Sequence, residues 1–212
     1  VRAVATQTLR EARNRDAFLQ RGNRVLGLPI EVISGREEAR LIYQGVSRLQ
    51  PSELPRLVID IGGRSTEMIL GVGRNARQVE SFAVGSVSLS LQHFPQGRYS
   101  AEYFRSAQIA AGAEFEEALT LFSREAWREA LGSSGTVGAV SQILAASGIT
   151  DGSITPEGLR WCIERCIEAG SADHVLRTKR RLRRRCLLAP QQRRAGLHGA
   201  ATARARSEEH TV

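Results

Sequence analysis

The sequence predicts an α/β fold. Apolar runs of strand length alternate with segments whose apolar residues recur at helical spacing, and glycine, proline and capping residues mark the boundaries between them. Strands mixed with helices at this spacing are typical of α/β proteins. The 212 residues, 42% of them hydrophobic, suffice for one large domain or two small ones with a buried core.

The N-terminal part is predicted to form two strands and two helices. The strands lie at 2–6 and 30–34, and the helices at 9–27 and 34–49. Gly27 follows the last periodic residue of the first helix and is expected to end it. Ser34 is the expected N-cap of the second helix, and Glu37 three residues later completes the pattern of a capping box.

The rest of the chain is predicted to continue with strands and helices. Strands are expected at 54–62, 66–73 and 78–85, a helix from 86, a long helix over 101–124, a strand, turn and helix within 129–148, and a helix over 155–170. A turn at 73–75 joins the second and third of these strands. Thr155 is the N-cap of the last helix, and Pro156 stands at its first position.

Composition excludes several classes of protein. No apolar run approaches the ~18–20 residues that a membrane-spanning helix needs, and no secretory signal opens the chain. The three cysteines, Cys162, Cys166 and Cys186, are odd in number and lack the spacing of metal ligands. Composition therefore indicates a reduced, cytoplasmic protein without a transmembrane segment.

The net charge of +8 belongs to the C-terminal segment. Residues 177–206 contain eleven Lys and Arg and no acidic residue, whereas residues 1–176 contain 19 basic and 20 acidic residues. We interpret residues 177–212 as a basic low-complexity tail produced by a frameshift or a sequencing adapter. Its amino-acid composition is that expected when GC-rich DNA is translated in the wrong reading frame. The alternative is a basic arm for an anionic polymer. The remainder carries no net basic charge, so no nucleic acid is expected as a partner.

Residues 57–70, LVIDIGGRSTEMIL, have the pattern of a phosphate-binding turn between two strands. The glycines at 62–63 would let backbone N–H groups approach phosphate oxygens closely. The hydroxyls of Ser65 and Thr66 would add donors. Asp60 would repel phosphate directly, so we expect it to act through Mg²⁺ or its water shell. An ordinary glycine-rich hairpin is the alternative.

Two further features would complete a phosphate site. GSSGT, residues 132–136, lies between a predicted strand and a helix N-terminus, where N–H groups favour an anion. Its alternative is a plain helix cap. Glu38 lies on the first turn of its helix and has no capping role. Beside bound phosphate it could polarise an attacking water as a general base, and its alternative is a solvated helix face.

The chain resembles the exopolyphosphatase / guanosine pentaphosphate phosphohydrolase family in four ordered motifs: ATQTLREARN, IEVISGREEARLIYQGV, LVIDIGGRSTEMIL and GSSGT. The resemblance runs to about residue 176 and includes FPQGRYSAEYF and ITPEGL. It implies bacterial, actin-like (ribonuclease H-like) domains with a mixed sheet flanked by helices, truncated here at both ends. It also implies that residues 1–41 end a first domain and that residues 42–176 form an incomplete second one.

The resemblance assigns roles to individual residues. Glu38 matches the catalytic base of the family, and Arg10 matches an arginine that helps to hold the phosphate chain. Asp60 and Glu67 match acidic positions that serve the Mg²⁺ ion and the attacking water. The phosphate-binding positions of the family match Gly62, Gly63, Ser65, Ser134, Gly135 and Thr136.

Two departures from the family pattern bear on function. Arg64 stands where the family usually has a third glycine. It could donate to phosphate, or it could be strained if the position needs a positive φ, and we expect strain and a narrowed turn. The first phosphate loop of the family lies upstream of the position of Val1, so residues 1–212 by themselves are expected to be inactive.

The predicted function is an Mg²⁺-dependent exopolyphosphatase, homodimeric in its full-length form, that hydrolyses the terminal phosphate of inorganic polyphosphate with water activated by Glu38. One alternative is a guanosine pentaphosphate 5′-phosphohydrolase, because the same chemistry serves both substrates. Another is a non-catalytic phosphate-binding sensor on the same fold. Glu38 argues against the sensor, since a pure binder gains little from a carboxylate beside a polyanion.

Overall fold

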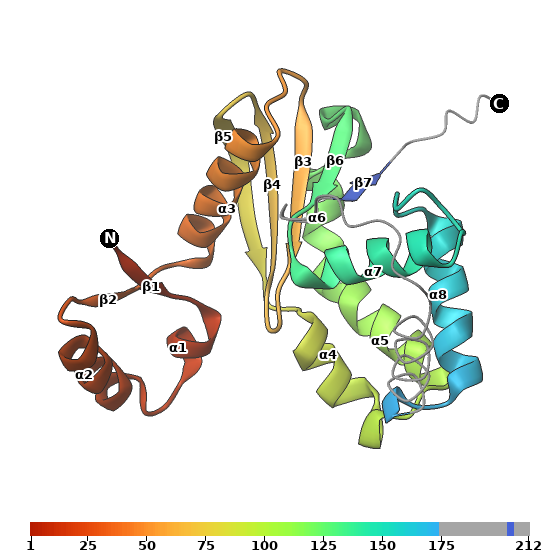
Figure 1. Cartoon of the computed structure of the whole chain (residues 1–212), viewed down its shortest axis with the longest axis horizontal. Coiled ribbons are helices and arrows are strands. Elements are labelled where there is room, and N and C mark those ends of the chain that lie inside the picture. Colours follow the sequence, from red (N-terminus) through yellow and green to blue (C-terminus); the bar gives the residue numbers. More distant parts are fainter. Residues whose placement is uncertain (174–202, 206–212) are drawn as a thin grey trace, which may run out of the picture.

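A computed structural model describes residues 1–173 and the backbone of 203–205 (Figure 1). The first elements are β1 (Ala3–Ala5), α1 (Gln7–Glu11), α2 (Arg15–Leu26), β2 (Ile30–Val32), α3 (Gly35–Leu49), β3 (Arg56–Ile61), β4 (Thr66–Val72) and β5 (Asn75–Phe82). They are followed by α4 (Ser86–His93), α5 (Ala101–Glu114), α6 (Glu116–Leu121), β6 (Glu129–Gly132), α7 (Gly135–Ala146), α8 (Pro156–Ala169) and β7 (Ala203–Ala205). Two 3₁₀ turns lie at Pro95–Gly97 and Arg124–Ala126.

The strands form two sheets. β1 and β2 pair in parallel as a small sheet next to α1 and α2. The larger sheet has the order β5-β4-β3-β6-β7, in which β3 and β6 are parallel and the other neighbours are antiparallel. Figure 1 shows α3 on one side of this sheet and α5, α6, α7 and α8 on the other side. The predicted α/β architecture with a mixed sheet flanked by helices is therefore confirmed.

The larger sheet is buried on both faces. On one face, residues of α3 pack against the sheet in a cluster of Ala39, Tyr43, Val46, Val58, Ile69 and Leu131. On the other face, residues of α6 and its flanks form a cluster of Leu57, Phe82, Val84, Ala118, Phe122 and Ala130. Leu57 and Val58 thus enter opposite clusters, as alternate strand residues must. This two-sided burial explains why the middle of β3, residues 57–59, is continuously apolar rather than alternating.

Two predicted helices are interrupted. The helix expected over 9–27 is divided between α1 and α2, because Ala12 has an extended backbone with ψ of 124°. Gly27 ends α2 in the left-handed conformation at φ 69°, as predicted. The helix expected over 101–124 breaks at Phe115, whose ring packs edge-on against Phe82 with 5.4 Å between ring centroids. Tertiary packing of an aromatic residue overrides helix periodicity there.

The predicted caps are confirmed, with one correction. Ser34 and Thr155 accept backbone N–H groups three residues later, from Glu37 and Gly158. The carboxylate of Glu37, however, binds the guanidinium of Arg40 at 2.7 and 2.8 Å. The capping box predicted at Ser34 is therefore only half formed, because a charged partner on the next turn holds the glutamate side chain.

The predicted domain boundary between residues 41 and 42 falls inside α3. Residues 1–32 contain no buried residue, whereas α3 packs along the larger sheet over much of its length. The division into two domains stays a prediction. The basic tail predicted at 177–212 lies outside the described residues, apart from the backbone of β7. Within the described residues, no helix is both long and apolar enough to cross a bilayer.

Candidate functional site

The turn between β3 and β4 is fixed by hydrogen bonds on both sides. Within the turn, the Gly62 N–H donates to the Ser65 carbonyl at 2.9 Å. The carbonyls of Gly62 and Gly63 accept N–H groups from the first turn of α4, at Ser86, Val87 and Ser88, over 2.8–3.0 Å. The Ser86 hydroxyl also donates to the Gly62 carbonyl at 3.1 Å. The predicted phosphate loop is therefore a preformed turn held by a neighbouring helix.

Gly85 makes the close approach of α4 possible. A Cβ atom at this position would lie 2.4 Å from the Arg64 nitrogen and 2.5 Å from the Gly63 carbonyl carbon. Both are backbone atoms, so a side chain could be accommodated only if the turn or the helix moved. The loop position thus depends on a glycine outside the motif that sequence inspection singles out.

We expect Gly85→Ala to lower the free energy of unfolding by ~1–3 kcal/mol, because overpacking against backbone forces a shift. Urea denaturation of residues 1–212 measures the effect. Gly112→Ala is the matched control: it lies in α5 with no neighbouring atom within 4 Å of the added Cβ, and should stabilise the helix by ~0.5–1 kcal/mol. Unchanged stability in Gly85→Ala would show that the contact relaxes without cost.

Asp60 lies at the end of β3 and connects the two predicted phosphate loops. Its Oδ2 atom accepts a hydrogen bond from the Ser133 hydroxyl at 2.6 Å. The Ser133 N–H in turn donates to the Ile59 carbonyl at 3.0 Å. Ser133 was not among the predicted site residues, although it is the first serine of the GSSGT motif.

Glu67 lies directly opposite Asp60 across the β3–β4 pair. Its carboxyl group is buried, with 1% of the residue exposed, and accepts from the Ser81 hydroxyl at 2.8 Å. Burial raises the pKa of Glu67, the hydrogen bonds from Ser81 and Ser65 oppose this rise, and the charges of Glu38 and Asp60 add to it. The three predicted carboxylates are thus close enough to interact electrostatically.

Glu38 is held by the predicted phosphate-binding arginine. Glu38 Oε2 lies 3.2 and 3.3 Å from the two terminal nitrogens of Arg10, and both side chains are about one-fifth exposed. Arg10 also donates to the Ile33 carbonyl at 2.7 Å and to Gln7 Oε1 at 2.7 and 3.0 Å. The structure therefore brings these two predicted residues together, and Gln7 is a further residue that orients the arginine.

Close packing also places Glu38 next to the sheet. A Cβ atom at Gly35, at the start of α3, would lie 2.5 Å from both the Cβ and the hydroxyl of Ser81. Ser81 is the residue that binds Glu67. The first turn of α3, which carries Glu38, therefore lies against the strand position that supports Glu67.

The predicted hydroxyl donors serve largely structural contacts. Ser65 and Thr66 are buried, and the Thr66 hydroxyl donates to the Val84 carbonyl at 2.7 Å. Ser134 caps α7 by accepting from the Val137 N–H at 3.1 Å. Thr136 donates to the Ser86 hydroxyl at 3.4 Å, which joins the second loop to α4, and Gly135 is exposed. The hydroxyl groups of Thr66, Ser134 and Thr136 therefore already have partners within the protein.

Asp60 and Glu67 are the predicted ligands of Mg²⁺. Among residues 1–173, no group of three or more His, Cys, Asp or Glu side chains is arranged to hold a metal ion. Mg²⁺ is commonly bound through one or two carboxylates together with waters and substrate phosphates. Two carboxylates, Asp60 and Glu67, suit an Mg²⁺ ion that binds together with the phosphate substrate. They do not form a complete metal site by themselves.

Arg64 corrects an expectation from the sequence. Gln96 is the only residue other than glycine with a positive φ in the described part of the chain. Arg64 therefore needs no left-handed backbone, and the predicted strain is wrong. Its side chain is 54% exposed, and its Nε atom lies 3.7 Å from Glu11 Oε2 on α1. The side chain extends toward α1 instead of distorting the turn.

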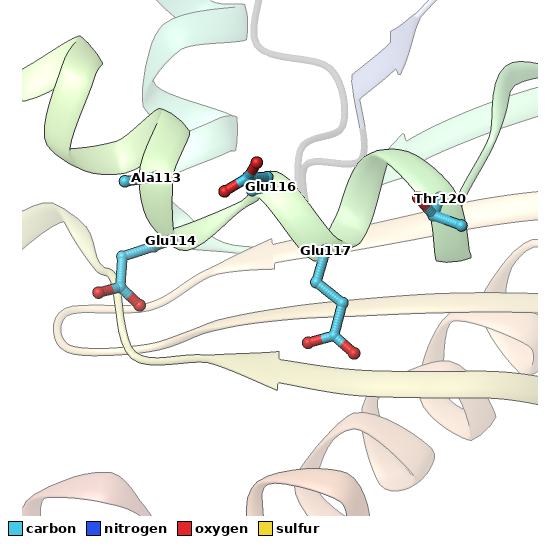
Figure 2. A pocket seen from close by; sticks show the side chains of 5 residues that line it. All are labelled: Ala113, Glu114, Glu116, Glu117 and Thr120. Atoms are coloured by element: carbon cyan, nitrogen blue, oxygen red, sulfur yellow. The ribbon is translucent and has the colours of Figure 1, made fainter.

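Two cavities lie outside the turn between β3 and β4. One, of about 260 Å³, is lined mainly by apolar residues of β3, β6, α7 and α8, and Thr136 is the only predicted site residue on its wall. The other, of about 540 Å³, lies along α5 and α6, where Glu114, Glu116 and Glu117 line it together with Ala113 and Thr120 (Figure 2). The carboxylates of the second hollow have the wrong charge for a phosphate chain.

Comparison with known proteins identifies a family and relatives of this chain. The Ppx/GppA phosphatase family matches residues 1–190, a range that extends past Leu176 into the basic segment. A curated Haemophilus influenzae protein named "Putative exopolyphosphatase" is 41% identical over 169 residues, which cover 80% of this chain and 52% of that protein. The chain thus spans about half the length of this relative.

Solved structures show the same fold. A structure of the Aquifex aeolicus PPX-GPPA enzyme superimposes with a TM-score of 0.66 at 26% identity, covering 85% of this chain and 60% of that chain. An exopolyphosphatase from Cytophaga hutchinsonii gives a TM-score of 0.60 at 26% identity, covering 74% of this chain and 50% of that chain. This similarity confirms the predicted actin-like form of the α/β fold.

Proposed function

The chain belongs to the Ppx/GppA phosphatase family, and we propose that it contributes the general base and two phosphate loops to an exopolyphosphatase. The substrate is inorganic polyphosphate, from which the enzyme releases the terminal phosphate. The observation that carries this proposal is the Arg10–Glu38 pair beside the β3–β4 hairpin, whose two strands carry Asp60 and Glu67. A partly buried carboxylate that is held by a guanidinium, beside two further carboxylates, can accept a proton from an attacking water.

The proposed reaction is in-line hydrolysis. Glu38 accepts a proton from water as the water oxygen attacks the terminal phosphorus, and the bond from that phosphorus to the bridging oxygen breaks. The products are orthophosphate and a chain shortened by one phosphate. Backbone N–H groups at 63–65 and 134–136 would stabilise negative charge on the transferring group, since those of Gly62 and Ser133 donate to carbonyls within the protein. Arg10 would orient Glu38 and hold the phosphate chain.

Magnesium belongs to the same proposal. Mg²⁺ would neutralise charge on the phosphate oxygens when bound, and Asp60 and Glu67 are the residues that would hold it or its water shell. Ser133 and Ser81 orient these carboxylates through their hydroxyl groups. The homodimer that the family resemblance implies is likewise part of the proposal for the whole protein.

The second candidate substrate is guanosine pentaphosphate, whose 5′ terminal phosphate would undergo the same attack. Phosphate release from each substrate, measured in parallel with an enzyme that contains this chain, tests both proposals. Faster turnover of polyphosphate (kcat/KM) supports the first proposal, and faster turnover of guanosine pentaphosphate supports the second. Binding of polyphosphate without turnover of either substrate would favour the non-catalytic sensor. Residues 1–212 alone provide the background, since we expect them to be inactive.

A further inference from the structure

We propose that Arg64 is a substrate-binding residue that contacts the non-bridging phosphate oxygens of a bound polyphosphate chain. The inference rests on the proposed function, because it names a further contact for the same substrate. Arg64 stands at a position where the resembled family usually has glycine. Three features of the molecule support this contact: the backbone of the turn, the surroundings of the guanidinium and the charge of the site.

The backbone of Arg64 is fixed without strain. The turn is pinned by N–H groups from the first turn of α4, and Gly85 approaches the Arg64 nitrogen closely. Arg64 is not among the residues with a positive φ. The guanidinium therefore extends from a rigid turn, which reduces the conformational entropy that a ligand contact would lose.

The guanidinium is accessible to a stronger anion than its present partner. The Arg64 Nε to Glu11 Oε2 distance of 3.7 Å exceeds that of a hydrogen bond, and the two side chains are 54% and 50% exposed. An exposed ion pair of this kind contributes little to stability. Phosphate oxygens accept charge-assisted, bidentate hydrogen bonds from arginine, so a polyphosphate chain would compete effectively with Glu11.

Arg64 and Arg10 approach the same region from the two sheets. Glu11, the partner of Arg64, follows Arg10 directly on α1, and Arg10 itself is paired with Glu38. Figure 1 shows α1 beside the small sheet, on the side that faces the β3–β4 turn and the start of α4. Arg64, from the larger sheet, thus pairs with Glu11 on α1, and Arg10 on α1 pairs with Glu38 on α3. A phosphate chain bound between α1 and the larger sheet could contact both arginines.

The charge of the predicted site favours a second arginine. Glu38, Asp60 and Glu67 are three carboxylates, and Arg10 is the only basic residue among the predicted site residues. Such a set repels a polyanion unless cations offset it. Arg64 supplies one positive charge within the phosphate loop itself.

The test is the affinity of residues 1–212 for inorganic polyphosphate across a NaCl titration. Arg64→Gln should weaken binding by ~5–10-fold and reduce the slope of log affinity against log salt by about one, as loss of one phosphate contact does. Arg74→Gln is the matched control, because Arg74 is exposed and lies in the turn at the other end of β4. It removes the same charge and should change affinity by less than about twofold.

A site-resolved measurement separates this contact from any contribution of the basic tail. Arginine modification followed by mass spectrometry should show that polyphosphate protects Arg64 but leaves Arg74 reactive. Equal effects at Arg64 and Arg74 in both measurements, with binding intact, would overturn the inference and leave the proposed function standing. A wild-type chain that does not bind polyphosphate would overturn the inference and count against the proposed function as well.

Discussion

Glu38→Gln is expected to lower phosphate release from polyphosphate by ~10²-fold or more in an enzyme that contains this chain. General-base catalysis typically contributes ~10²–10⁴-fold, and the amide cannot accept the proton of the attacking water. Affinity for polyphosphate should persist, because the substitution removes a negative charge and releases Arg10 from its ion pair. Single-turnover phosphate release and equilibrium binding, measured together, separate these two effects.

Glu37→Gln is the matched control for this experiment. Glu37 lies on the same helical turn but binds Arg40 on the surface of α3. The Glu37→Gln variant should retain turnover within about twofold of the wild type. Near-normal turnover in Glu38→Gln would remove Glu38 from the mechanism, and an equal loss in both variants would indicate a general disturbance of the α3 N-terminus.

Local sequence signals were sufficient to predict most of the elements around the site. The run of 57–70, with glycines in its middle, predicts the β3–β4 hairpin because strand residues and turn residues are neighbours in the chain. Ser34 predicts the start of α3 for the same reason. These features depend on contacts over a few residues, which a sequence displays directly.

Features that depend on distant contacts were not predictable. Arg10 lies on α1 beside the small sheet, whereas its partner Glu38 lies on α3, which packs on the larger sheet. The Asp60–Ser133 hydrogen bond joins residues 73 positions apart in the chain. The backbone conformation of Arg64 was predicted wrongly, because α4 and Gly85 hold that turn, and the motif alone does not reveal them. The roles proposed for Asp60, Glu67 and the phosphate loops stay predictions that the variants above can test.

The buried Arg56–Glu129 pair leads to the largest expected effect on stability. Arg56 is 2% exposed, and its guanidinium donates to Glu129 Oε1 at 2.9 and 2.6 Å across the parallel β3–β6 pair. Glu129→Ala would leave the arginine charge buried, with its bond to the Gln50 carbonyl at 2.6 Å still formed. Removing one partner of a buried ion pair costs ~3–5 kcal/mol, because the other charge loses its compensation.

We therefore expect Glu129→Ala to lower the free energy of unfolding of residues 1–212 by this amount in urea denaturation, and the melting temperature by on the order of 10 °C. Glu168→Ala is the control, since Glu168 pairs with Arg165 on the exposed side of α8 and such pairs contribute little. The double variant Arg56→Leu/Glu129→Leu should recover much of the loss, because it removes both charges together. A Glu129→Ala variant as stable as the control would mean that solvent or another group compensates Arg56, and that the pairing of β3 with β6 does not depend on this ion pair.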